Sequence, residues 1–181
     1  LAPLPPEVLD AVGPYVPACR MMGTMAAQML GRTPKTLKVE LAGALQDADA
    51  APLLAAVLDG ALSYRRIGSF TAANAAAIAD SHGIAVSASA VHDAQEYASS
   101  VRVVADEVEV AATLFGTEHT PRIISLMGYK IDIAPATTSL VFEYVDAPGR
   151  IGVIGTILGE AAANITTMQI GTKPEESCAL V

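Results

Sequence analysis

Tryptophan is missing from the sequence, phenylalanine occurs three times and cysteine twice. So few aromatic rings leave little surface on which bases could stack. The 11 basic residues are outnumbered by 19 acidic ones, which gives a net charge of −8. Because nucleic acids bind to basic surfaces, no nucleic-acid partner is expected. No apolar run is long enough to cross a bilayer, so no membrane partner is expected either.

The two cysteines, Cys19 and Cys178, lie far apart and fit no metal-ligand spacing. They are typical of free thiols in a reducing compartment. The Pro-rich opening at residues 1–6 has no basic patch ahead of an apolar run, so it does not resemble a signal peptide. The sequence therefore predicts a cytoplasmic protein without a bound metal.

The 181 residues are 52% hydrophobic, enough to bury a core. Their spacing alternates between the periods of helices and strands and predicts an α+β fold, with helices packed on a mixed or antiparallel sheet. Strands are predicted over residues 36–45, 84–91, 100–105, 108–115, 122–127, 129–133, 140–145 and 164–171, and from residue 177 onward. Helices are predicted up to Gly31 and over 47–64, 74–83 and 151–162.

Three local signals refine this pattern. The pair Asp106-Glu107 predicts a tight hairpin turn between two strands. Asn74 is a suitable residue to cap the helix that follows it. A stripe of methionines at 22, 25 and 29 suits either a binding groove or packing against a neighbouring element, and we expect packing.

The most informative motif runs from Tyr144 through Asp146 and Pro148 to Gly149. A strand enters an Asp-x-Pro-Gly turn that starts a helix, and the first amides of such a helix attract an anion. Asp146 offers a carboxylate to an ammonium group, and Asn164, further along, offers both a donor and an acceptor. Together these groups suit a free amino acid. Alternatively, Asp146 merely caps the helix and the glycines serve packing.

This arrangement resembles the start of an ACT domain, the βαββαβ module that senses amino acids in biosynthetic enzymes. The upstream segments resemble the intervening domain of long-form bacterial D-3-phosphoglycerate dehydrogenases. The segments that carry the resemblance are residues 5–12, 35–40, 74–76 and 110–116. The resemblance implies an intervening domain at residues 1–136, followed at 137–181 by an incomplete, ferredoxin-like βαββ(αβ) ACT domain that ends within a strand.

In that family the ACT domain binds L-serine, usually between two ACT domains. The resemblance thus implies L-serine as effector at Tyr144, Asp146, Gly149 and Asn164, and a homo-oligomer formed through both domains. It also implies a phosphate or substrate effector site at Arg122 and Lys130, although Tyr129 and Ala134 stand where some relatives have further basic residues. A solvated strand edge is the alternative for Arg122 and Lys130.

The sequence does not favour catalysis by this chain itself. The glycines at 149, 152 and 155 have the wrong spacing for a dinucleotide-binding fingerprint, so no cofactor is expected in this chain. The resemblance implies that the parent enzyme binds NAD in another domain. His82 is expected at a helix end, and no role is predicted for His119. His92 and Asp93 could be a base and the group that orients it, but neighbours in sequence on a strand point to opposite faces, so they form such a pair only if they lie in a turn. The pair Arg65-Arg66 suits a helix C-terminus.

The leading hypothesis is therefore the regulatory and oligomerisation region of an NAD-dependent phosphoglycerate dehydrogenase, the first enzyme of L-serine biosynthesis. Two alternatives stay open. One is the regulatory region of an L-serine dehydratase, which would have a cysteine-rich partner region. The other is a stand-alone ACT protein that binds an amino acid.

Overall fold

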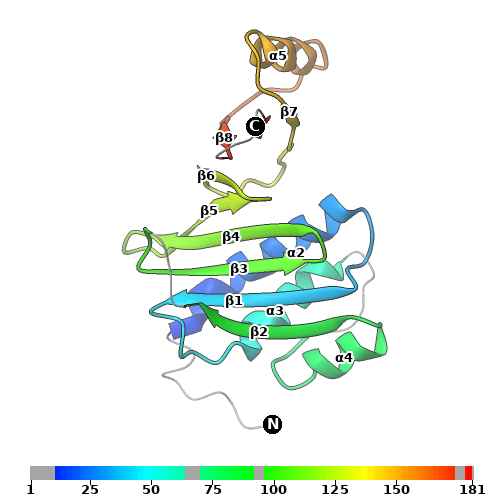
Figure 1. Cartoon of the computed structure of the whole chain (residues 1–181), viewed down its shortest axis with the longest axis vertical. Helices are drawn as coiled ribbons and strands as arrows, with labels where there is room; N and C mark the ends of the chain where they lie inside the picture. Colours follow the sequence, from blue (N-terminus) through cyan, green and yellow to red (C-terminus); the bar gives the residue numbers. More distant parts are fainter. Residues whose placement is uncertain (1–10, 64–69, 92–95, 174–177, 181) are drawn as a thin grey trace.

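The computed structural model describes residues 11–63, 70–91, 96–173 and 178–180 of the chain. A mixed sheet runs through it with the strand order β2-β1-β3-β4-β5-β6-β8-β9-β7, and helices pack on one side (Figure 1). The strands are β1 Thr36–Gly43, β2 Ala85–Val91, β3 Ser99–Ala105, β4 Val108–Phe115, β5 Thr120–Leu126, β6 Tyr129–Ile133, β7 Glu143–Val145, β8 Gly171–Thr172 and β9 Cys178–Leu180. The helical elements are η1 Gly13–Tyr15, α2 Val16–Leu30, α3 Ala51–Ala61, α4 Ala75–Ser81 and α5 Arg150–Glu160. The predicted α+β fold is confirmed.

The mixed character of the sheet comes from one parallel pair. β1 and β2 run parallel, with Thr36 opposite Ala85, and the chain between them contains α3 and α4. From β3 to β6 the strands follow one another antiparallel, in the order of the sequence. A parallel pair needs a long crossover while an antiparallel pair needs only a tight turn, so the helices fall between β1 and β2.

The core lies between this sheet and the helices α2 and α3. Leu37, Val39 and Leu41 alternate along β1 and are at most 3% exposed, as are Val101 and Val103 of β3. Cys19 of α2 lies in the same core as a free thiol with no exposed surface. Burial raises the pKa of the Cys19 thiol far above its ordinary value. The alternation predicted for β1 is thus explained by one face packing on helices.

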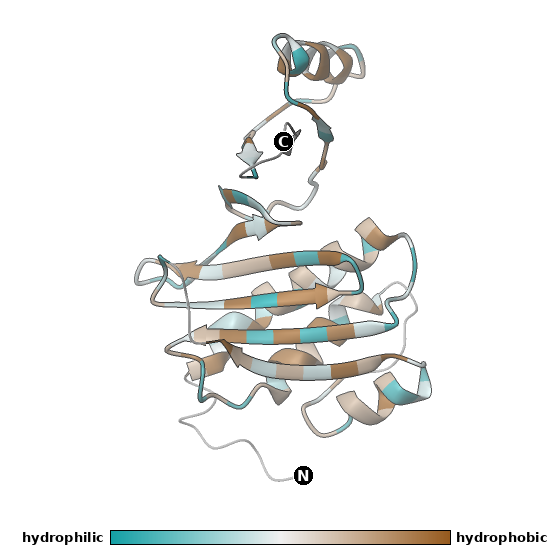
Figure 2. Ribbon diagram, viewed as in Figure 1, coloured by the Kyte–Doolittle hydropathy of each residue, from teal (hydrophilic) through white to brown (hydrophobic). Residues whose placement is uncertain are grey.

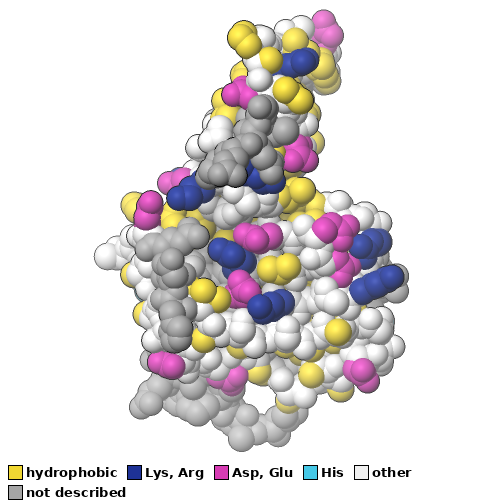
Figure 3. All heavy atoms as spheres, viewed as in Figure 1, with side chains coloured by type: hydrophobic (Ala, Val, Ile, Leu, Met, Phe, Trp, Pro, Cys, Tyr) yellow, Lys and Arg dark blue, Asp and Glu magenta, His cyan; other side chains and the backbone are white. Residues whose placement is uncertain are grey.

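The other face of the sheet carries no helix among the described residues and is charged. Lys38 and Glu40 of β1 form an ion pair at 2.7 Å there. Arg102 of β3 lies between Glu40 and Glu109, at 3.8 and 3.5 Å. Figure 2 shows hydrophilic residues alternating with hydrophobic ones along these strands, and Figure 3 shows basic and acidic side chains interspersed on this face. The sheet therefore has one dry face and one solvated face.

Helices α2 and α3 cross in direct backbone contact. A methyl group on Gly23 would overlap the carbonyl oxygen of Val57, and one on Gly60 would overlap that of Arg20. The hydroxyl of Thr24 donates to the Gly60 carbonyl at 3.2 Å. The two glycines therefore set how closely the helices approach each other.

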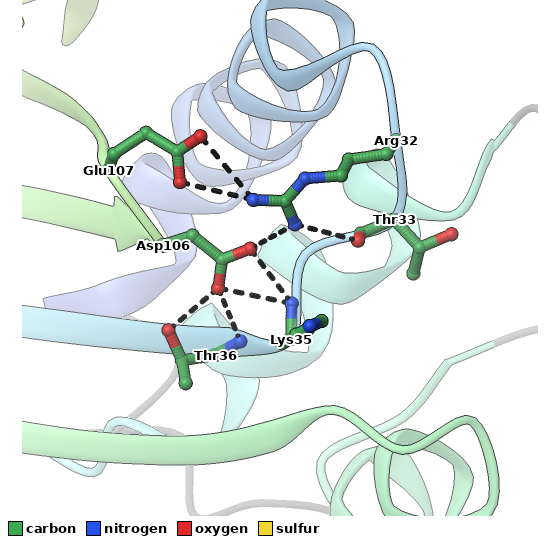
Figure 4. Close-up of polar contacts among 6 residues, drawn as sticks. All are labelled: Arg32, Thr33, Lys35, Thr36, Asp106 and Glu107. Atoms are coloured by element: carbon green, nitrogen blue, oxygen red, sulfur yellow. Dashed lines mark hydrogen bonds and ion pairs between the residues drawn. The ribbon is translucent and has the colours of Figure 1, made fainter.

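The β3–β4 hairpin turn falls at Asp106-Glu107, as predicted, with Asp106 at a φ of 49°. The Asp106 carboxylate accepts hydrogen bonds from the backbone amides of Lys35 and Thr36, the Thr36 hydroxyl and Arg32 (Figure 4). Burial by itself raises the pKa of Asp106, but the Lys35 and Thr36 amides, followed by Arg32 and the Thr36 hydroxyl, outweigh it and hold the pKa far below its ordinary value. This carboxylate fastens the hairpin to the start of β1.

The C-terminal part has the connectivity of a split βαβ unit. β7 leads through α5 to β8, and β9 lies between β7 and β8, antiparallel to both. This is the start of the ferredoxin-like topology. The predicted strand over 164–171 is wrong except for its last residue, because Asn164 to Thr167 are exposed and have no described strand beside them. The strand expected over 140–145 is likewise reduced to β7.

Other predicted details also need correction. The helix expected over 47–64 is shorter, since α3 begins at Ala51, with Pro52 in its first turn, and ends at Ala61. Asn74 does occupy the N-cap position of α4, yet its side chain accepts from the Thr71 amide at 2.7 Å instead of capping the helix. The helix predicted over 151–162 is present as α5, but none of its residues is buried, and Ile157 is 59% exposed.

The two parts of the sheet meet at Tyr129. Its ring is fully buried, and its hydroxyl donates to the Glu143 carboxylate of β7 at 2.8 Å. The ammonium group of Lys173 lies 4.3 Å from the ring centroid. Gly171 of β8 lies so near to the Lys130 carbonyl and the Ile131 side chain that a methyl group would overlap both. The start of β6, residues 129–131, therefore contacts both β7 and β8.

Candidate functional site

The turn between β7 and α5 brings three of the predicted effector residues together. Tyr144 is half-buried on β7, Asp146 is exposed directly after it, and Gly149 is the N-cap of α5. Gly149 has a φ of 88°, a left-handed conformation that glycine adopts without strain. The predicted Asp-x-Pro-Gly turn is thus what allows the helix to start immediately after the strand.

The amino end of α5 has unsatisfied donors. No side chain caps it, and among the described residues the amides of Ile151 and Gly152 find no backbone acceptor. Asp146 forms no hydrogen bond or ion pair within the described part of the chain, so it does not serve as the helix cap. Free amides and a free carboxylate therefore stand on the same turn, available to opposite ends of a zwitterion.

Tyr144 and Asp146 influence each other electrostatically. Burial raises the pKa of the Tyr144 phenol, and the negative charge of Asp146 raises it further. The phenol therefore stays protonated near neutral pH and keeps its hydrogen-bond donor beside the carboxylate.

Asn164 is not brought to this turn within one chain. It follows the carboxyl end of α5, whereas Asp146 precedes the amino end. The 11 residues of α5 span about 16 Å at the rise of an α-helix. Asn164 is exposed and makes no hydrogen bond among the described residues. Within one chain, α5 therefore separates Asn164 from Asp146.

The predicted phosphate residues, Arg122 and Lys130, lie on the open face of the sheet. The Arg122 guanidinium donates to the Asp132 carboxylate at 2.7 Å and to its carbonyl at 2.9 Å, so Arg122 already has a partner. Lys130 makes no ion pair within the described residues and lies beside a shallow cleft of about 180 Å³. Phosphate binding by this pair stays a prediction.

Sequence reasoning missed the other polar residues of this cleft. They share the open face and include Glu40, Ser100, Arg102, Glu109 and Ser125. The alternation of polar and apolar residues along β3 and β4 could have indicated that these polar side chains share one face. It could not show that Arg102 stands opposite Glu40, because that register is set by pairing between distant strands.

The methionine stripe lies where α2 meets the edge of the core. Met22 is fully buried, which confirms packing, while Met25 and Met29 are half-buried. These two line a groove of about 870 Å³ together with Ile131, Ile133 and Leu140.

The histidines show no catalytic arrangement among the described residues. His82 ends α4, as predicted, with its Nδ1 atom 2.8 Å from the Ile78 carbonyl oxygen. His119 lies in an exposed turn at a φ of 50°. His92, Asp93 and the pair Arg65-Arg66 lie outside the described residues. Within the described part, no three His, Cys, Asp or Glu side chains gather as metal ligands, and no helix is long and apolar enough to span a membrane.

Comparison with known proteins now gives the family. The family model described as the D-3-phosphoglycerate dehydrogenase intervening domain matches residues 11–127. The chain is 30% identical over 173 residues to the D-3-phosphoglycerate dehydrogenase of Mycobacterium leprae, which covers 93% of the chain and 33% of that protein. It is 30% identical over 181 residues to that of Synechocystis sp., covering 94% and 31%, and 26% identical over 165 residues to that of Bacillus subtilis, covering 90% and 31%. The chain thus spans about a third of the length of these curated relatives. It belongs to the D-3-phosphoglycerate dehydrogenase intervening-domain family.

Proposed function

We propose that the chain is the regulatory and assembly region of a D-3-phosphoglycerate dehydrogenase, and that residues 137–181 are the first part of an ACT domain that binds L-serine. The parent enzyme would oxidise 3-phosphoglycerate with NAD in L-serine biosynthesis, and the redox chemistry would belong to its other domains. The relatives described above are all named as this dehydrogenase, which supports it over the dehydratase and stand-alone alternatives.

The turn after β7 carries this proposal. The free amides of Ile151 and Gly152 suit the carboxylate of an amino acid, and the unpaired Asp146 carboxylate suits its ammonium group. Tyr144 supplies a hydroxyl donor from the strand. In this proposal Asn164 comes from a second copy, which completes the site at an interface between two ACT domains.

A route from this turn to the intervening domain supports a regulatory role. Glu143 neighbours Tyr144 on β7 and accepts the hydrogen bond from the buried Tyr129. A ligand regulates an enzyme when it binds one arrangement of domains better than another. In this proposal serine favours the arrangement in which two turns face each other.

The decisive experiment measures L-serine binding to the full-length protein by isothermal titration calorimetry. Asp146→Ala should weaken binding by roughly ten-fold or more, equal to about 1.4 kcal/mol, because the ammonium group loses its counter-charge. Glu118→Ala removes an exposed carboxylate in the turn between β4 and β5, away from the proposed site, and serves as the matched control. Unchanged affinity in the Asp146 variant would show that the ligand assignment is wrong.

A further inference from the structure

The groove beside the methionine stripe runs along one side of α2. Pro17, Met21, Met25 and Met29 recur every four residues and therefore line it from the first turn of the helix to the last. At the rise of an α-helix these residues span about 18 Å. The groove has a volume of about 870 Å³, which is the size of a small-molecule site. It is therefore long enough for an extended ligand that lies parallel to α2.

The rest of the groove belongs to the junction between the two parts of the sheet. Ile123 and Leu126 of β5, each 2% exposed, line it together with Ile131 and Ile133 of β6. The far side is formed by the segment 134–141, which connects β6 to β7. Figure 1 shows β5 and β6 between the large sheet and the C-terminal part. A molecule in the groove would therefore contact both parts.

The side chains of the groove suit an aliphatic chain. Among the described residues that line it, none is aromatic, so a flat ring would find no ring on which to stack. Methionine side chains are unbranched and flexible, so Met21, Met25 and Met29 can adjust to a flexible ligand. Leu140 and Val141 also line the groove and are 58% and 38% exposed. An alkyl chain would remove this apolar surface from water.

The charge of the groove suits an anionic head group. Arg20 is the one charged side chain among the described residues that line it, although the whole chain has a net charge of −8. The Arg20 side chain is 65% exposed and contacts the Asp59 carboxylate through Nη2. Because a guanidinium has five N–H donors, further donors of Arg20 are available to a second carboxylate.

We infer that this groove binds a free fatty acid, with its carboxylate at Arg20 and its alkyl chain along the methionine stripe. Arg20 lies in the first half of α2 and Met29 near its carboxyl end, so the alkyl chain extends toward Met29. The bound chain would bridge α2 and the segment 134–141, which leads directly into β7. This site is separate from the proposed serine site, since it includes neither the turn after β7 nor α5.

Isothermal titration calorimetry of the full-length protein with dodecanoate, kept below its micelle concentration, tests the inference. A single molecule should bind per chain. Decanoate is two methylene groups shorter and should bind roughly ten-fold more weakly, because less apolar surface is buried. Dodecyltrimethylammonium has the same alkyl chain with a cationic head, and it should also bind roughly ten-fold more weakly or worse, because its charge repels Arg20.

Three variants locate the ligand in the groove. Arg20→Gln should weaken dodecanoate binding and abolish the preference for dodecanoate over dodecyltrimethylammonium. Met25→Glu places a carboxylate among the apolar side chains and should remove dodecanoate binding. Phe115→Glu, the matched control, replaces a 70% exposed apolar side chain outside the groove and should leave the affinity unchanged. Circular dichroism of each variant confirms that it is folded before affinities are compared.

Several results would overturn the inference, and the first two need only the wild-type protein. Dodecanoate that does not bind, or that binds no better than decanoate, has no alkyl site here. Equal affinities for the anionic and the cationic ligand would exclude a role for Arg20. Equal losses in Met25→Glu and Phe115→Glu would place the ligand outside the groove. L-serine titrated into the same variants should bind with unchanged affinity, so the failure of either site is recognised separately.

Discussion

At the residue scale, Asp106 contributes to stability through its charge. Its carboxylate accepts from two backbone amides, a hydroxyl and a guanidinium, and 12% of its side chain is exposed. The sequence predicted the turn from Asp106-Glu107, because a short polar pair between two apolar strands is a local signal. The network was not predictable, since its partners at 32–36 lie about seventy residues away in the chain.

Asp106→Asn should lower the free energy of unfolding at pH 7 by about 2 kcal/mol, because an amide accepts weaker hydrogen bonds than a carboxylate. Asparagine tolerates the left-handed conformation at this position, so the backbone stays the same. Urea denaturation measures the change. Asp132→Asn, which removes an exposed ion pair with Arg122, should cost less than about 0.5 kcal/mol.

The effect of Asp106 also depends on pH. The pKa of Asp106 in the folded state lies below the unfolded value of about 3.9, so its stabilisation is complete well above that value and is lost as the pH falls below about 4. The difference between the wild-type protein and the Asp106→Asn variant should therefore shrink in acid. A difference that stays constant from neutral pH to about pH 3 would contradict the role of the charge.

At the scale of elements, helices α2 and α3 cross at two glycines that contact the backbone of the other helix. The glycines of α5 have no such contact. Gly23 has the Val57 carbonyl against it, whereas Gly155 of α5 has nothing within 4 Å of an added methyl group. The sequence shows both simply as glycines in helices. Whether a helical glycine contacts another helix depends on how a segment distant in the sequence packs against it.

Gly23→Ala should destabilise the protein by about 2 kcal/mol, because the helices must separate to admit the methyl group. Gly155→Ala should instead stabilise α5 by about 0.5 to 1 kcal/mol, since alanine is the better helix former. Thermal unfolding followed by circular dichroism tests the first change, and amide exchange within α5 tests the second. If both substitutions stabilise the protein, or both destabilise it, the proposed role of the helix contact at Gly23 is wrong.

Element prediction succeeded where a strand or helix has a buried side. The alternation of Leu37, Val39 and Leu41 is strong because one face of β1 packs on helices. Element prediction failed beyond residue 140, where the apolar pattern predicted a strand over 164–171 that is longer than the observed β8. A strand exists only beside a neighbour, and Asn164 to Thr167 have none within the described part of the chain.

At the scale of the whole molecule, Tyr129 joins the intervening-domain sheet to the C-terminal part. Tyr129→Phe removes the hydrogen bond to Glu143 but keeps the buried ring. The opening free energy of β7 should fall by about 1 kcal/mol, while that of β1 and β3 stays unchanged. Native-state hydrogen exchange at Val145 and Val103 measures the two.

Glu143→Gln is the matched variant, because its side-chain carbonyl still accepts the hydrogen bond, and it should have a smaller effect than Tyr129→Phe. If the phenylalanine variant lowers protection equally across the whole sheet, the contact is part of the general core and does not join two separable parts.

The candidate site was predictable in part. The turn residues Tyr144, Asp146 and Gly149 are close in sequence, so the motif itself brought them together. Asn164 is separated from them by a helix, and the length of that helix places it at the opposite end. Local sequence therefore identifies the turn, whereas the place of Asn164 in the site stays a prediction.

The enclosed thiol of Cys19 has a practical consequence for studying this protein. Thiol reagents react with the thiolate. In the folded protein the Cys19 sulfur is buried and its raised pKa keeps it protonated, so these reagents do not react with it. Alkylation at this position must therefore wait until α2 lifts from the sheet. The labelling rate of Cys19, followed by mass spectrometry, accordingly reports how often the helical layer opens.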